Sequence, residues 1–358
     1  MARTKRATLK SIASDLGVTH TSVSNAYNNP AKVSKALRDR IIAHARSVNY
    51  EGPNPAARSL RTGRCGAIGV LFNDPLSYAF TDPHDIAFLR GISSVCEDEG
   101  ANIVLIPLQN KRPQQRDQLA AIVDGFILNA PYRSHPTIRQ ALARELPTVV
   151  VDFDAPALSS VLTNDRASMQ AVVAHLLALG HRHIAIVTFP REEGAGDVRS
   201  LADDFSDESH VVHERIEGCR AALDAAGIAR ASVPVCETPN SEDGGRRTAG
   251  WLLHRRPDLT ALVCFSDRVA HGAIAGAGAL GLAVPDALSV TGFDGVELPG
   301  GAPAALRLTT VRQNAWEKGR RAAEILLRPR DVDAGAVVIP AEFVVGDTTG
   351  PARDARGR

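Results

Sequence analysis

The 358-residue chain is long enough for two or three domains, and its hydrophobic content of 44% with a net charge of +1 is typical of a globular protein with a large core. The longest run without Asp, Glu, Lys or Arg, from Val269 to Pro285, is Gly-rich and shorter than the roughly 20 apolar residues that a membrane span needs. No apolar signal-peptide core follows the basic N-terminus, so we expect a cytoplasmic protein that does not bind membranes.

The cysteines are odd in number, scattered, and never in CxxC spacing. This pattern predicts reduced structural thiols rather than a disulfide framework or a zinc site. The five residues are Cys65, Cys96, Cys219, Cys236 and Cys264.

Charge is distributed unevenly along the chain. Residues 1–64 hold 12 Lys or Arg against 3 Asp or Glu, a net charge of +9, which leaves −8 for the remainder. A basic head on an acidic body is typical of a nucleic-acid-binding module, because neutralising phosphates supplies most of the non-specific affinity. A merely solvated surface is the alternative.

The stretch from Thr8 to Asn28 predicts two short helices separated by a tight turn. The first helix has an apolar stripe at helical spacing, begins after the N-cap Thr8 and ends at Gly17, where a left-handed C-cap belongs. Thr19 caps the second helix. Its expected outward-facing side chains are His20, Thr21, Ser22, Ser24 and Asn25. This layout is that of a helix-turn-helix, whose second helix enters the DNA major groove, although a generic helical hairpin is the alternative.

The second helix supplies the predicted contacts to DNA bases. His20, Thr21 and Asn25 are the expected base readers, and Asn25 suits the adenine edge. Ser22 and Ser24 are expected on phosphates. The complete set of predicted DNA-binding residues is Thr8, Thr19, His20, Thr21, Ser22, Ser24, Asn25, Asn28, Asn54, Ala57 and Leu60.

A third helix and a linker complete the head. Ser34 caps the third helix, whose apolar face closes a three-helix core. In the linker, Asn54 can cap a short helix from Pro55 to Leu60, which we expect to form only when something packs against it. Leu60 either wedges between base steps in the minor groove or docks on the body.

Several segments in order resemble the lac-repressor/galactose-repressor (LacI/GalR) family of bacterial transcription regulators. In the head and hinge these are ATLKSIASDLGVTHTSVSNAYN, VSKALRDRIIAHARSVNY and PNPAARSLRTGR. In the body they include LALGHRHIAIV, VPDALSVTGFDG and LTTVRQ. The resemblance covers nearly the whole chain and implies a homodimer, or a tetramer, that binds double-stranded operator DNA and a small-molecule effector.

The body is predicted to hold parallel sheets covered by helices, because short β-branched runs alternate with helical segments. Its length favours two sheets, and the resemblance implies two lobes of a periplasmic-binding-protein-like fold joined by crossovers. The expected strands are Ala67–Phe72, Asn102–Pro107, Gly125–Leu128, Thr148–Asp152, Ile184–Phe189, Ala261–Phe265 and Leu288–Gly292.

The expected domains follow from this organisation. They are a helix-turn-helix headpiece 1–52, a hinge helix 53–64, a first lobe 65–163 and 292–320, a second lobe 164–291 and 321–346, and a flexible tail 347–358.

Polar side chains stand where predicted strands end, which is where ligands bind in such sheets. Asp152, Ser266 and Asp294 follow strands, and Arg215 opens a helix. Carboxylates, a hydroxyl and a guanidinium suit a ligand with several hydroxyl groups, although each Asp could instead be a helix cap or a surface ion pair.

The resemblance implies that the matching positions line an effector cleft. In order of preference they are Arg215, Ser266, Asp294, then Gln313 and Asp152, then Asp82. The ligand is expected to be sugar-like, with a nucleoside or purine also open, and Ser266 stands where the family usually has Asn. The segment Ser77–Asp85 departs from the usual short loop. Ring-stacking or core residues are expected at Tyr78, Phe80 and Trp251.

Enzymatic patterns are weak. Gly276, Gly278 and Gly281 spell GxGxxG, but they lie about ten residues past the preceding predicted strand and better indicate a closely packed helix face. We therefore expect no cofactor, no metal and no catalytic residues.

The expected function is that of a repressor that binds pseudo-palindromic operators under allosteric control. The alternatives are a cytoplasmic sugar-binding receptor without a genetic role and an NAD-linked enzyme.

Overall fold

The computed structural model describes residues 7–52, 63–72, 75–107, 122–131, 140–141, 143–155, 158–190, 198–206, 209–296, 306–329 and 335–353. The chain divides into two compact units, one of Met1–Gly66 with Ile122–Asp124 and the other of the remaining residues. Within the described ranges no helix is long and apolar enough to cross a membrane. The predicted hinge contacts Asn54, Ala57 and Leu60 lie outside the described residues.

The headpiece contains the three predicted helices. They are α1 (Leu9–Leu16), α2 (His20–Asn28) and α3 (Lys35–Ser47), with a short 3-10 turn at Pro30–Lys32. Each helix contributes a fully buried aliphatic side chain to the core, namely Ile12, Val23 and Ile41. A core this small stabilises its unit only marginally.

Side-chain caps fix where these helices begin. The hydroxyl of Thr8 accepts the Ser11 N–H at 3.2 Å, and that of Thr19 accepts the Ser22 N–H at 3.1 Å. Gly17 ends α1 with φ 65°, the left-handed conformation predicted for it.

The first lobe of the second unit is built on a six-stranded parallel sheet with strand order β12-β5-β4-β3-β1-β2. Its strands are β1 (Ala67–Phe72), β2 (Asn102–Pro107), β3 (Phe126–Asn129), β4 (Thr148–Val151), β5 (Ser159–Thr163) and β12 (Ala336–Ile339). Helices α6 (Pro83–Glu99) and α12 (Ala315–Leu327) pack together on one face. Gly91 permits this close approach, because a Cβ there would lie 1.9 Å from the Trp316 carbonyl oxygen.

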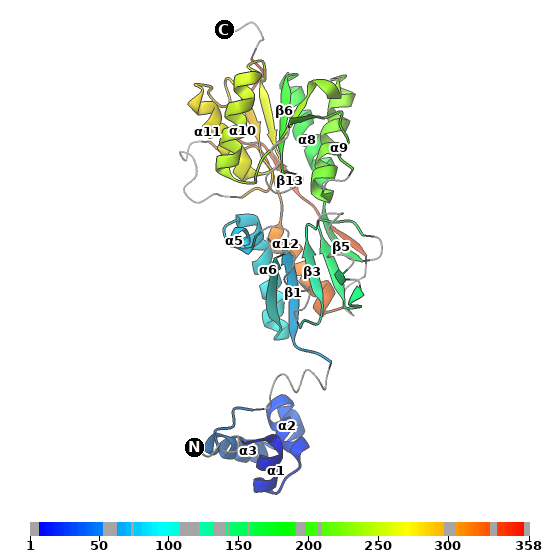
Figure 1. Cartoon of the computed structure of the whole chain (residues 1–358), viewed down its shortest axis with the longest axis vertical. Coiled ribbons are helices and arrows are strands. Elements are labelled where there is room, and N and C mark those ends of the chain that lie inside the picture. Colours follow the sequence, from blue (N-terminus) through cyan, green and yellow to red (C-terminus); the bar gives the residue numbers. More distant parts are fainter. Residues whose placement is uncertain are drawn as a thin grey trace, which may run out of the picture. The chain divides into compact units, whose positions relative to one another are not determined.

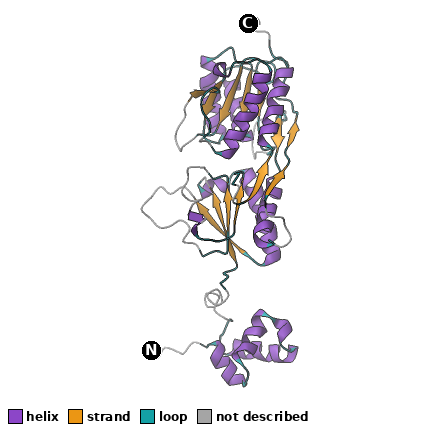
Figure 2. Ribbon diagram, turned by 90° about the vertical axis from the view of Figure 1, so that its right-hand side faces the viewer, coloured by secondary structure: helices purple, strands orange, loops and turns teal. Residues whose placement is uncertain are grey.

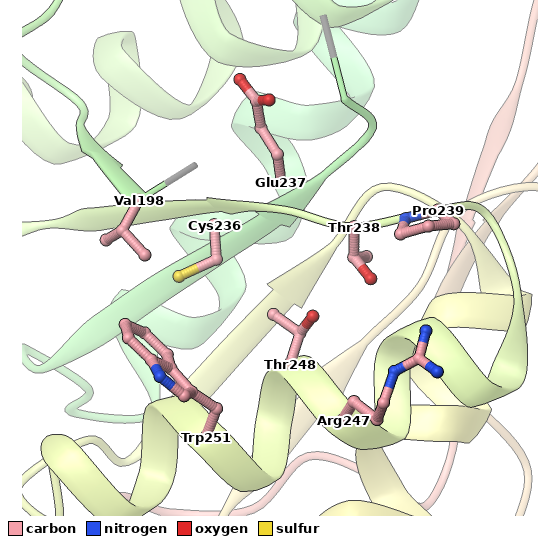
Figure 3. Close-up of a pocket in the computed structure, with 8 residues that line it drawn as sticks. All are labelled: Val198, Cys236, Glu237, Thr238, Pro239, Arg247, Thr248 and Trp251. Carbon is pink, nitrogen blue, oxygen red and sulfur yellow. The ribbon is translucent and has the colours of Figure 1, made fainter. Parts of the chain in front are cut away.

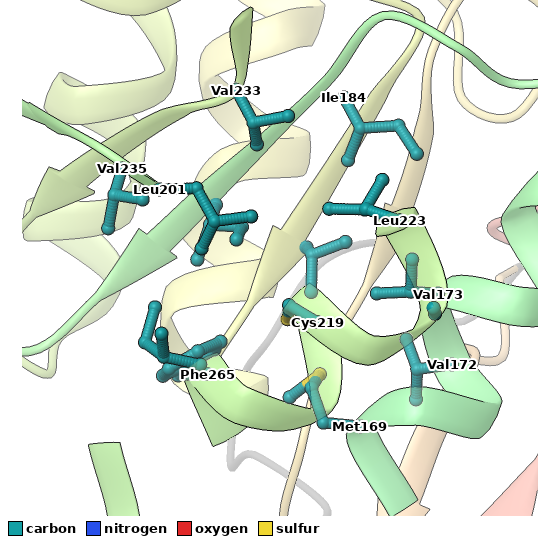
Figure 4. Close-up of a cluster of buried hydrophobic side chains, with 14 of the residues drawn as sticks. Met169, Val172, Val173, Ile184, Leu201, Cys219, Leu223, Val233, Val235 and Phe265 are labelled. Atoms are coloured by element: carbon teal, nitrogen blue, oxygen red, sulfur yellow. The ribbon is translucent and has the colours of Figure 1, made fainter. Parts of the chain in front are cut away.

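The second lobe holds a five-stranded sheet with strand order β10-β9-β6-β8-β7, in which only β7 is antiparallel. Its strands are β6 (Ile184–Thr188), β7 (Val198–Ser200), β8 (Pro234–Glu237), β9 (Ala261–Cys264) and β10 (Ser289–Thr291). Helices α8 (Asp165–Ala178) and α9 (His210–Ala225) cover one face (Figure 1). Their apolar side chains meet those of the strands in the core shown in Figure 4.

Helices α10 (Glu242–Arg255) and α11 (Asp267–Ala279) cover the opposite face of the second sheet. The predicted close packing of the Gly-rich segment is confirmed at Gly276, where a Cβ would lie 2.5 Å from the Arg246 carbonyl oxygen. Gly278 faces open space, and Gly281 follows the helix with φ 74°. The segment is therefore a helix-packing surface rather than a phosphate-binding loop.

Two short antiparallel strands, β11 (Thr310–Arg312) and β13 (Glu342–Val344), form a third small sheet. Isolated bridges from Thr291 to Thr309 and from Asp294 to Arg312 join β11 to the chain at the end of β10. Figure 2 shows the strands of both lobes in orange with helices beside them in purple. All five cysteines are free thiols, as predicted. Burial raises the pKa of Cys96 to about 11 and that of Cys236 to about 12.

The expected lobe boundaries near the C-terminus are wrong. Residues 321–346 were assigned to the second lobe, but most of α12 lies in the first lobe and β12 pairs with β5 of the first sheet. Residues 347–353, expected in a flexible tail, join the second lobe instead. There the Val290 N–H donates to the Thr348 carbonyl at 2.8 Å, and the buried Thr348 hydroxyl donates to the Val290 carbonyl at 2.7 Å.

Candidate functional site

The outward face of α2 carries part of the predicted DNA-reading set. His20 and Thr21 are exposed, and Ser22 and Asn25 are half-buried. We expected Ser24 to face outward, but this is wrong, because the residue is only 8% exposed. The Asn28 amide nitrogen donates to the Ser24 carbonyl at 3.0 Å and lies 3.3 Å from its hydroxyl. Ser24 and Asn28 are one helical turn apart and lie beside the buried stripe of α2. Their side chains are therefore engaged in hydrogen bonds within the helix.

Several polar groups of the headpiece have structural contacts. Arg38 donates to the Ala26 carbonyl at 3.3 Å, and Arg40 donates to the Leu16 carbonyl at 3.0 Å. These cations satisfy carbonyls near the C-terminal ends of α1 and α2, where the helix dipole favours positive charge. The hydroxyl oxygens of Thr8 and Thr19, both predicted DNA contacts, accept capping hydrogen bonds.

Four of the predicted effector residues of the second unit lie at strand or helix ends. Asp152 directly follows β4 with φ 51°, and Asp294 follows β10 with φ 120°. Ser266 caps α11, and Asp82 caps α6. Such positive φ angles are strained for non-Gly residues, which is typical of functional positions.

One hydrogen-bonded chain joins three of these residues. Lys318 Nζ lies 2.8 and 2.7 Å from the two carboxylate oxygens of Asp152, and it also donates to Gln313 Oε1 at 2.7 Å. Gln313 Nε2 in turn donates to Asp294 Oδ1 at 2.8 Å. Lys318 is only 1% exposed. It was missed in the sequence analysis, although a Lys among buried Ala residues of an amphipathic helix was an available signal.

Burial and charge shift the acid–base behaviour of this chain. Burial raises the pKa of Asp152, but Lys318 more than offsets it and holds that pKa below its usual value. Burial raises the pKa of Asp294 to about 6. Burial, reinforced by the charge of Asp294, also holds the pKa of Asp267 well above its usual value. Burial disfavours the charged forms of Asp267 and Asp294, so hydrogen-bond donors next to these carboxylates stabilise them.

A second chain, which we call the interlobe chain, runs between the lobes through Ser266, Asn240, Tyr78 and Asp82. Each of its three links is a hydrogen bond of 2.6 Å, from Ser266 Oγ to Asn240 Oδ1, from Asn240 Nδ2 to the Tyr78 hydroxyl, and from that hydroxyl to Asp82 Oδ2. Tyr78 belongs to the short helix α5 (Leu76–Ala79). Arg268 Nη1 lies 3.6 Å from Asp82 Oδ2, and its guanidinium carbon lies 5.2 Å from the Tyr78 ring centroid.

Arg215 lies inside α9 rather than at its start as expected, because α9 begins at His210 behind the cap Ser209. Its Nε donates to Asp165 Oδ1 at 2.8 Å, and its guanidinium stacks 3.5 Å from the Phe293 ring centroid. The side chain is therefore rigidly held at the carboxyl ends of the second sheet.

Asp82, His84 and Asp85 offer ligand atoms within 4.8 Å of one another, a spacing that could hold a cation. However, Asp82 Oδ1 already accepts the His84 N–H at 2.8 Å as the cap of α6, and Tyr78 occupies the other oxygen. The positive helix N-terminus and the nearby Arg268 also oppose a second positive charge. These groups fit hydrogen bonding better than a metal.

The two other aromatic residues named from the sequence do not join these chains. Phe80 is largely exposed. Trp251 lines a separate cavity of about 360 Å³ at the carboxyl end of β8, with Thr238 and Thr248 beside it (Figure 3). The Arg255 guanidinium already lies 4.3 Å from the Trp251 ring centroid.

Comparison with known proteins decides what these two units are. A model of bacterial regulatory proteins of the lacI family matches residues 8–54, and a periplasmic binding protein-like domain matches residues 173–349. An HTH-type transcriptional regulator of Mycolicibacterium smegmatis is 39% identical, over 97% of this chain and 97% of its own length. The chain belongs to the lacI family.

Two solved structures share its fold. The Lac repressor dimer bound to operator and the anti-inducer ONPF has a TM-score of 0.77 at 24% identity, covering 97% of this chain and 100% of that chain. The complex of the transcriptional regulator CelR with cellobiose has a TM-score of 0.66 at 22% identity, covering 96% and 100%. The lacI-family chain is thus a DNA-binding transcriptional regulator with an effector-binding domain, and not an enzyme.

Proposed function

We propose that this regulator is a repressor that binds a pseudo-palindromic operator as a homodimer, and that a small sugar-like molecule bound between its lobes changes its operator affinity. The observation that carries the proposal is the meeting of polar side chains from both lobes at the strand ends, through Tyr78 and Asn240 and through Arg268 and Asp82. A ligand there changes the lobe equilibrium by its differential affinity for the two arrangements.

The proposed effector contacts are Arg215, Ser266, Asp294, Gln313, Asp152 and Asp82. We add Lys318 and Asn240, because each is hydrogen-bonded to one or more of these residues or to Tyr78. Carboxylates, amides and a guanidinium match the donors and acceptors of a hydroxylated ligand. The solved complex of CelR with cellobiose supports a sugar-like effector.

For DNA, we propose His20, Thr21 and Asn25 as base readers and Ser22 as a phosphate contact, in a headpiece of residues 1–52 followed by a hinge of residues 53–64. The exposure of His20 and Thr21 supports the proposal, and Ser24 is withdrawn from it because it is buried. The solved Lac repressor, a dimer on its operator, supports two-fold binding of a pseudo-palindrome.

Two measurements test the proposal. A thermal-shift screen with sugars, nucleosides and purines is expected to find a stabilising ligand, and that ligand is expected to change a gel shift on DNA upstream of the gene. Selection of bound sites from random DNA is expected to give a palindrome whose preference changes in Asn25→Ala. An unchanged preference, or a ligand that leaves the gel shift unaltered, would contradict the corresponding assignment.

A further inference from the structure

His84 holds a buried polar atom that has no partner among the described residues. It is the second residue of α6, and its imidazole is 17% exposed at the side-chain level. Its Nε2 is shielded from solvent and makes no hydrogen bond among the described residues. Native structures rarely leave such an atom unsatisfied, because burying it without a partner costs free energy. Within the described part of the chain, Nε2 therefore offers a hydrogen-bonding position that a bound ligand can fill.

The other ring nitrogen fixes how the imidazole is held. His84 Nδ1 lies 3.7 Å from Asp85 Oδ1, and Asp85 receives the Asn129 amide at 3.4 Å. Burial lowers the pKa of His84, but the interaction with the Asp85 carboxylate and the charge of Asp294 outweigh it, so the pKa is raised. This environment favours the doubly protonated ring, in which Nε2 is a hydrogen-bond donor.

The neighbours of His84 place it beside one of the hydrogen-bonded chains described above. A ring nitrogen of His84 and a carboxylate oxygen each of Asp82 and Asp85 lie within 4.8 Å of one another, which places the ring beside the Asp82 end of the interlobe chain. His84 also follows Asp82 in the segment Ser77–Asp85, which departs from the usual family pattern.

The charges around His84 favour an uncharged ligand. Each nearby cation already has a carboxylate: Lys318 has Asp152, Arg215 has Asp165 and Arg268 has Asp82. The charge of a protonated His84 likewise has Asp85, 3.7 Å away. Among the described residues, Asp267 and Asp294 form no ion pair and accept hydrogen bonds from neutral groups, which for Asp294 is the Gln313 amide. A phosphate would meet these carboxyl groups with every nearby described cation already paired, whereas a hydroxyl can donate to one carboxyl group and accept from a histidine.

We infer that His84 is an effector-binding residue, which donates a hydrogen bond from Nε2 to a hydroxyl oxygen of an uncharged polyol. The inference rests on the proposed function, since it places the effector between the lobes. The inference adds one contact residue to the proposed function. It also specifies the ligand class, because it favours neutral polyols over phosphate esters.

The test uses the full chain and isothermal titration calorimetry with neutral pentoses, hexoses, disaccharides and cyclic polyols, each beside its phosphate ester. His84→Gln keeps an amide N–H near the position of Nε2, whereas His84→Asn loses it. His254→Gln, at an exposed position on α10, is the matched control. We expect a neutral polyol to bind wild type and the control equally, His84→Gln within about fivefold, and His84→Asn about 10- to 100-fold more weakly.

Each contrary outcome overturns a distinct statement. If a neutral polyol binds wild type and His84→Asn alike, or if the phosphate ester binds more tightly, the inference is wrong and the proposed function stands. If wild type binds no probe, both fail. Should His84→Asn not fold, the Nε2 resonance of His84 in ¹⁵N-labelled wild type decides, because it must move when the polyol is added; an unmoved resonance overturns the contact.

Discussion

Replacing Lys318 with Met should destabilise the effector-binding unit by about 3 to 5 kcal/mol, because it leaves a buried carboxylate without its cation. Lys318 is 1% exposed, and both oxygens of Asp152 contact its ammonium group at 2.7 to 2.8 Å. Urea unfolding followed by circular dichroism measures the loss.

The double variant Lys318→Met with Asp152→Asn is the control. It removes both charges, so we expect most of the lost stability to return. The pH dependence gives a second check. Without Lys318, burial is the largest remaining influence on Asp152 and is expected to raise its pKa against the charges of His84 and Arg215. The deficit of the single variant should then shrink as the pH falls below about 5. A single variant within about 1 kcal/mol of wild type, or a double variant no better than the single one, would refute this reasoning.

Three further predictions concern other sites. Thr19→Ala removes the cap of α2, so the headpiece should lose about 1 kcal/mol in thermal unfolding, and an unchanged melting temperature would contradict the capping role. Burial raises the pKa of Asp294 to about 6, so the folded protein binds that proton more tightly than the unfolded chain; the free energy of unfolding should therefore fall as the pH rises from about 4 to about 6, and Asp294→Asn should weaken this dependence. Tyr78→Phe leaves Asn240 and Asp82 without a shared hydroxyl, so hydrogen exchange at the lobe edges should accelerate, whereas unchanged exchange would show that the interlobe chain does not hold the lobes together.

The features that sequence predicts well here are local. Thr8 and Thr19 cap helices because each lies three residues before the N–H that it accepts, a relation visible in the sequence. Strands β1 and β2 match their predicted bounds, because each is a short run of apolar residues. The helix-turn-helix and the two-sheet body were therefore predictable.

The features that sequence missed depend on partners far along the chain. Lys318 pairs with Asp152 across 166 positions, and Asn240 meets Tyr78 across 162, so neither contact has a local signature. Ser24 was misplaced for another reason: a polar residue next to Val23 looks exposed, but helical rotation brings it to the edge of the core. For the same long-range reason, the expected lobe of residues 321–346 is wrong where β12 pairs with β5, a strand far earlier in the chain.

The late position of α12 and β12 in the chain has a consequence for synthesis on the ribosome. The first lobe begins with β1, but its edge strand ends at Ile339, about 270 residues later. At typical elongation rates, roughly 15 to 50 s pass between the synthesis of β1 and that of β12, and α12, which covers Gly91, is also made late in this interval. Meanwhile its sheet exposes apolar residues and an unpaired edge at β5, so a nascent chain needs protection from aggregation until nearly all of it has emerged.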